Sequence, residues 1–148
     1  MAGTIMASFK AQLLTELQAH STLSSIQVAY ADPGGAARRE CVFLGDISNN
    51  QHDPESISSG RRRRIEDFDL EVFVFVNSKP RSSPQDCEAR AIVLADAVEE
   101  VVADDPQLSN LTGLLYCQVS EMSMSTVETG DGPATTVTLT INAKARLT

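Results

Sequence analysis

One long strand-forming run, residues 65–76, constrains the fold of this chain more than any other feature. It reads Ile-Glu-Asp-Phe-Asp-Leu-Glu-Val-Phe-Val-Phe-Val, with an apolar residue at every second position from Phe68 to Val76. This period of two is typical of a strand with one buried face. The opposite face carries Asp67, Asp69, Glu71, Phe73 and Phe75. At about 3.3 Å per residue the run would span about 40 Å. Such a long strand, apolar on both faces at its far end, is poorly suited to an exposed edge, so we predict that it lies in the middle of a sheet.

Two amphipathic helices are predicted on either side of this strand. In the first, Ile5, Phe9, Leu13 and Leu17 recur at the spacing of one helical face. The second has a strong start signal, because Ser83 is a favoured N-cap and Pro84 suits the first helical position. Its predicted buried stripe consists of Cys87, Ala91, Leu94, Ala95, Val98, Val101 and Val102.

Four further strands complete the predicted fold, over residues 26–30, 39–46, 115–127 and 134–147. The last two are joined by a Gly-Asp-Gly-Pro turn and form a hairpin. The apolar alternation changes parity within residues 115–127, which predicts a β-bulge near Ser120 or Glu121. The order α-β-β-β-α-β-β predicts an α+β fold with two layers, in which a largely antiparallel sheet of about five strands packs against two amphipathic helices.

With 148 residues, the chain has the length of a single domain, so we predict one domain over residues 1–148. Residues 48–64 are polar and rich in Ser, Asn, Asp and Gly, and we expect a mobile loop there. No apolar run approaches the roughly 20 residues that a membrane span needs, so no membrane association is expected.

The sequence contains no pattern that predicts catalysis. A nucleophile needs a nearby base, but the two histidines, His20 and His52, fall at a helix end and in the predicted loop. Neither belongs to a zinc-binding pattern, and Pro-Gly-Gly at 33–35 lacks the frame of a phosphate-binding loop. We therefore predict no catalytic residue, no cofactor and no metal site, and expect that the protein is not an enzyme.

Two features are candidate subunit or partner contacts. The first is the basic run Arg61, Arg62, Arg63 and Arg64, which stands out in a chain of net charge −8. It is either a solvated loop or an electrostatic contact with an acidic partner, such as another copy's Glu-rich helix. The second is the pair Phe73 and Phe75, which lies either under a helix or within a subunit interface, where aromatic residues are enriched.

Several stretches, taken together, resemble the tail-terminator proteins of long-tailed bacteriophages. They are the N-terminal amphipathic helix, the strand that ends at Tyr30, Asp32-Pro33-Gly34, residues 39–45, residues 70–74, the helix 88–100 with its Asp105-Pro106 exit, and the alternating last strand that ends Arg146-Leu147. Their order and spacing extend over nearly the whole chain.

This resemblance implies a structural virion protein that forms a ring, typically of six copies. Such a ring caps the tail tube, ends tube polymerisation and joins the tail to the head connector. The implied partners are further copies of the chain, the tail-tube protein and a head-closure or connector protein, while DNA passes through the lumen without specific binding. The implied location is the tail or neck of the virion, with assembly in the host cytoplasm.

Two alternatives remain open from the sequence. The chain could be another neck component, such as a head-closure or tail-completion protein of related fold. From a different class, it could be a small acidic binding module of ferredoxin-like shape, which would have a discrete pocket and remain a monomer.

Overall fold

The computed structural model describes residues 3–54 and 64–147. The elements follow the order α1 (Met6–Ala19), β1 (Gln27–Ala29), a 3-10 turn (Gly34–Ala36), β2 (Glu40–Pro54), β3 (Arg64–Asn77), α2 (Pro84–Asp104), β4 (Leu114–Thr129) and β5 (Gly132–Leu147). The predicted α+β fold and its element order are confirmed.

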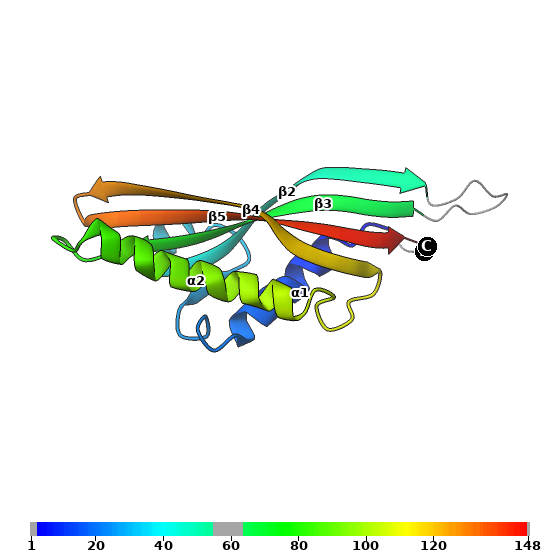
Figure 1. Ribbon diagram of the computed structural model, residues 1–148, viewed down its shortest axis with the longest axis horizontal. Helices are drawn as coiled ribbons and strands as arrows, with labels where there is room; N and C mark the ends of the chain where they lie inside the picture. The colour runs from blue at the N-terminus through cyan, green and yellow to red at the C-terminus, as the bar shows by residue number, and fades with distance from the viewer. Residues whose placement is uncertain (1–2, 55–63, 148) are drawn as a thin grey trace.

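Five strands form one sheet in the order β1-β2-β3-β5-β4. All neighbouring pairs are antiparallel except β1 and β2. The long strand β3 is paired on both sides, with β2 and with β5, so it lies in the middle of the sheet as predicted. Both helices pack against the same face of the sheet, which we call the helix face; the opposite one is the helix-free face (Figure 1).

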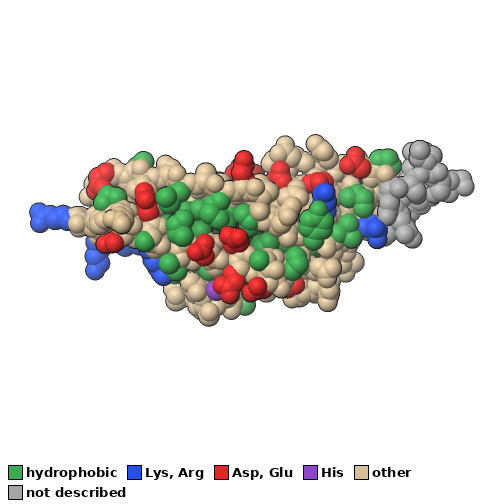
Figure 2. Space-filling model, viewed as in Figure 1, with side chains coloured by type: hydrophobic (Ala, Val, Ile, Leu, Met, Phe, Trp, Pro, Cys, Tyr) green, Lys and Arg blue, Asp and Glu red, His purple; other side chains and the backbone are tan. Residues whose placement is uncertain are grey.

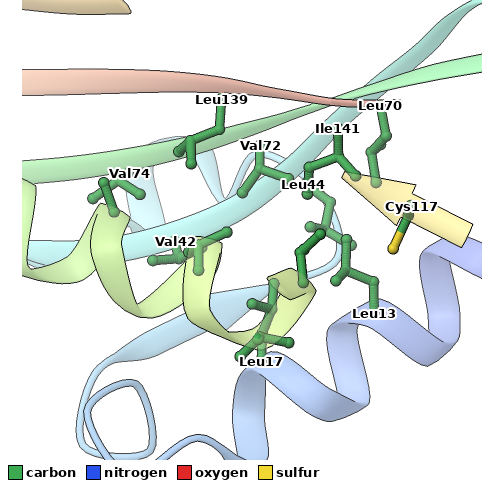
Figure 3. Packing of buried hydrophobic residues seen from close by; sticks show 14 of the residues in the cluster. Leu13, Leu17, Val42, Leu44, Leu70, Val72, Val74, Cys117, Leu139 and Ile141 are labelled. Atoms are coloured by element: carbon green, nitrogen blue, oxygen red, sulfur yellow. The ribbon is translucent and has the colours of Figure 1, made fainter. Parts of the chain in front are cut away.

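The hydrophobic core lies between the helix face and the two helices. The alternating residues of β3 from Phe68 to Val76 are buried there, opposite β5 partners such as Leu139 and Ile141. Figure 3 shows Val72, Leu139 and Ile141 on the sheet side of the core, with Leu13 and Leu17 of α1 on the other side. The predicted stripe of α2 is buried in full.

The bulge predicted in β4 is present, because the pairing of β4 with β5 shifts between Val119 and Glu121. The extra residue keeps both halves of β4 in phase with β5: Val119 lies opposite Ile141, and Met122 opposite Leu139. Without this insertion Met122 would point to the helix-free face, since side chains alternate along a strand.

The predicted loop over residues 48–64 is wrong for its first part, because β2 continues to Pro54 and pairs with β3 along this length. Polar residues led to the loop prediction, but the first half of β3 needs a neighbour for its backbone groups. Two register shifts, at Leu44/Ile47 and Ser48/Gln51, allow β2 to continue in pairing. The remainder of that prediction, residues 55–63, lies outside the described residues.

A buried carboxylate, that of Glu66, connects β3 to the start of α1. Glu66 is 0% exposed, and its Oε1 accepts a hydrogen bond of 3.1 Å from the backbone amide of Ile5, the N-cap residue of α1. Its Oε2 accepts hydrogen bonds from the hydroxyl of Thr4 and from Nδ2 of Asn50, the latter at 2.7 Å. His52 Nε2 lies 3.4 Å from the same oxygen.

These contacts control the ionisation of Glu66. Burial by itself would raise the pKa of the carboxyl group, but the hydrogen bonds from Thr4, Asn50 and the Ile5 amide, together with His52, outweigh it and lower the pKa. The carboxylate is therefore favoured in the folded chain, where it satisfies a backbone amide at the α1 N-terminus.

Truncation of a core side chain to alanine should lower the free energy of unfolding much more than truncation of a side chain on the helix-free face. Leu139→Ala should lower the free energy of unfolding by about 2–5 kcal/mol, because Leu139 is fully buried. The adjacent residue Thr138 points to the opposite face, so Thr138→Ala should cost less than about 1 kcal/mol. Urea denaturation of both variants measures the difference, and equal losses would contradict the assignment of the two faces.

Glu66→Gln should change how stability depends on pH. A lowered folded pKa adds stability above the ordinary carboxyl pKa of 4.5, and this contribution is lost as the pH falls through the lower folded value. The variant should be about 1–3 kcal/mol less stable near pH 7, with a difference that narrows below pH 4.5.

Chemical denaturation of the wild type and of Glu66→Gln across a pH series measures how their difference in stability narrows. Glu71→Gln, an exposed carboxylate on the helix-free face, serves as the matched control and should change stability by about 0.5 kcal/mol or less. A loss for Glu66→Gln that is the same at every pH would refute the assigned charge.

Candidate assembly surface

The helix-free face carries an aromatic cluster at one end, formed by Phe43, Phe73 and Phe75. Phe43 and Phe73 lie opposite each other on β2 and β3, and their rings stack with centroids 5.1 Å apart and an interplanar angle of 23°. All three side chains remain partly exposed. A Cβ atom at Gly45 would lie 2.6 Å from Cε2 of Phe73, so the absence of a side chain at Gly45 leaves room for this ring.

This arrangement decides one of the open alternatives for Phe73 and Phe75. Both helices pack on the opposite face of the sheet, so the prediction that these residues lie under a helix is wrong. Three partly exposed aromatic rings on a sheet face are typical of a contact surface. Their place in a subunit interface stays a prediction.

The remainder of the helix-free face is polar and acidic. Asp67, Asp69 and Glu71 of β3 lie beside Lys144, Asn142 and Thr140 of β5. Asn142 Nδ2 donates to Oδ1 of Asp67 at 2.6 Å and to Oδ1 of Asp69 at 3.0 Å, and Lys144 Nζ lies 3.8 Å from Asp67. The acidic row is thus partly bound within the chain itself.

The basic run is divided by the limits of the described structure. Arg61, Arg62 and Arg63 lie outside the described residues. Arg64 is exposed and is the first residue of β3, where it pairs with Pro54 and Leu147. The proposed contact of this run with an acidic partner therefore stays a prediction.

The two edges of the sheet differ in character. Strand β1 covers only residues 41–43 of β2, and the free remainder of β2 is polar and interrupted by two bulges. Such an edge is protected against strand addition. The other edge, β4, exposes Met122, Met124 and Val127 to 40%, 46% and 56%. Sequence alternation had indicated only the register of these residues; their exposure follows from the edge position of β4.

The described residues include no constellation that resembles an active site. Among them, no group of three or more His, Cys, Asp or Glu side chains could hold a metal ion. His20 lies 3.6 Å from Glu100 and His52 lies beside Glu66. Burial, with smaller effects of Glu16 and Asp105, raises the pKa of Cys117 to about 12, so its thiol is protonated at neutral pH. Within the described part of the chain, no helix is long and apolar enough to cross a membrane.

Comparison with known proteins gives a match in structure but none in sequence family. No protein-family model matches the chain, and no curated protein matches it. Among the solved structures that resemble it is a chain described as "Virion of native gene transfer agent (GTA) particle", with a TM-score of 0.58 and 18% sequence identity. The likeness covers 97% of this chain and 99% of that chain. At this identity the comparison establishes a shared fold over almost the whole length of both chains.

Proposed function

We propose that the protein is a structural subunit of a phage or phage-like virion and acts through assembly rather than catalysis. The observation that carries this proposal is the end-to-end likeness to a chain of a gene transfer agent virion, which leaves no large segment of either chain unmatched. The surface supports the same role. One sheet face is covered by the chain's own helices, while the other presents stacked aromatic rings and the β4 edge presents methionines.

Within this class we propose the tail terminator, a ring that caps the tail tube and joins it to the head connector. The sequence resemblance described above supports this role. A subunit whose contact surfaces lie at different places associates head to tail, and this gives a closed ring if the rotation closes. Six copies are the expected number from the resemblance.

The net charge of −8 fits a ring through which DNA must pass. An acidic subunit gives phosphates little to bind, because affinity for the DNA backbone depends on excess Lys and Arg. The proposed partners are the tail-tube protein beneath the ring and a head-closure or connector protein above it. A second candidate, another neck component of related fold, is equally compatible with this likeness, since the description of that virion chain names no position in the particle.

Particles made without the protein distinguish these roles. If the chain is the terminator, deletion of its gene should leave tails longer than normal, because nothing ends tube polymerisation. Electron microscopy of the lysate measures tail length, and a plasmid copy of the gene should restore it. Tailless heads beside tails of normal length would indicate the joining protein instead. Normal particles, together with a protein that stays monomeric and absent from virions, would refute the proposal and favour the binding module.

A further inference from the structure

An apolar and acidic strip runs along the contact between α2 and β4. Thr126 of β4 donates a hydrogen bond of 2.7 Å to Glu88 of α2, while Val119 and Glu99 line one cleft further along the same contact. Met124 and Met122 lie between these two points, so they flank the stretch of α2 from Glu88 to Glu99. We call this surface the α2–β4 strip; it consists of Glu88, Ile92, Asp96, Glu99, Met122 and Met124.

The strip has the properties of an uncovered contact surface. Its two methionines are 40% and 46% exposed, and Asp96 and Glu99 are exposed beside them. Figure 2 shows apolar side chains gathered in the middle of this face, with acidic side chains along one border. The single cation of α2, Arg90, binds Glu40 at 2.6 Å.

A basic end lies at the connection between β3 and α2, formed by Arg38, Arg39, Lys79 and Arg81. All four are exposed, and the first three line one cleft of about 520 Å³. The guanidinium of Arg39 donates to the carbonyl of Ser78 at 3.1 Å, which joins the two segments of the basic end. Figure 2 shows Lys and Arg side chains collected at this end of the molecule. Asp131 shares a second cleft with Arg38 and Arg39 and leaves the end net positive.

Opposite charges on two separate surfaces favour a particular geometry of association. A two-fold symmetric dimer that brings strip against strip, or basic end against basic end, would be repulsive. A reciprocal two-fold dimer, in which each basic end meets the partner's strip, uses both surfaces of each copy and closes at two copies, so it cannot extend into a ring. A head-to-tail contact brings the unlike surfaces together. Such a contact repeats, since each subunit still has one unused surface of each kind.

We propose that the basic end of one copy docks on the α2–β4 strip of the next copy, and that this contact repeats around the ring. The inference rests on the proposed function, since it names the surfaces by which the virion subunit contacts itself. The methionines supply flexible apolar area at the centre of the contact, and the carboxylates around them select a basic partner. The free edge of β4 lies beside the same contact.

Reciprocal charge reversal tests this contact. In the full chain, Lys79→Glu with Arg81→Glu reverses the basic end, and Asp96→Lys with Glu99→Lys reverses the strip. Each variant alone should associate at least about tenfold more weakly than the wild type, because like charges then meet. An equimolar mixture should assemble again with alternating subunits, since the reversed end of one variant fits the reversed strip of the other. Mass photometry over a concentration series measures the assembled fraction, and circular dichroism verifies that both variants are folded.

Asp46→Lys with Asp53→Lys, on the protected β2 edge, is the matched control and should assemble as the wild type does. Three results would overturn the contact but leave the virion role intact. They are assembly that is unchanged by both reversals, a mixture of the two variants that stays monomeric, and a control that assembles as poorly as the variants. Wild type that is monomeric at every concentration overturns the contact as well, and the virion role then depends on the deletion experiment. A final experiment measures the binding of a 20-base-pair DNA duplex to the wild type and to Lys79→Glu with Arg81→Glu. If this variant loses DNA binding while its assembly is unchanged, the basic end binds nucleic acid and the proposal is overturned.

Discussion

The burial of one sheet face beneath two helices is the constraint on which the remaining structure depends. Three long strands, β2, β3 and β5, must keep their apolar residues in phase along this face, because a slip of one residue would move them all to the other side. The bulges in β2 and β4 preserve this phase where the strands would otherwise lose it. The helix-free face is free of that requirement. It can therefore carry Phe43, Phe73 and Phe75 at one end and carboxylates at the other.

The buried carboxylate of Glu66 adds a polar connection to this apolar layer. It lies on the helix face, where a charge is costly unless it is bound by donors. Thr4 and the Ile5 amide, at the start of α1, and Asn50, in β2, supply these donors from two separate segments. The carboxylate thereby links three segments: the start of α1, the later part of β2 and the start of β3. No side chain caps α1 from within the helix; instead the Glu66 carboxylate binds the amide of the N-cap residue Ile5 from β3.

The proposed function rests on the surfaces that the chain leaves uncovered. The helix-free face, the α2–β4 strip and the basic end lie at different places on an elongated molecule (Figures 1 and 2). Surfaces separated in this way suit a subunit that contacts several neighbours at once. The likeness to a virion chain over nearly its full length agrees with this interpretation.

Local patterns in the sequence were sufficient for the α+β order, the central strand, the Ser83 cap, the buried stripe of α2 and the bulge near Ser120, because periodicity and capping depend on residues close together in the chain. The extension of β2 to Pro54 was missed, since its polar residues resemble a loop and only pairing with β3 makes them a strand. The donors of Glu66 lie as much as 62 residues away, and the acidic strip combines α2 with β4. Tertiary structure alone decided these contacts, and with them which face of the sheet stays bare, because they depend on which segments the fold brings together.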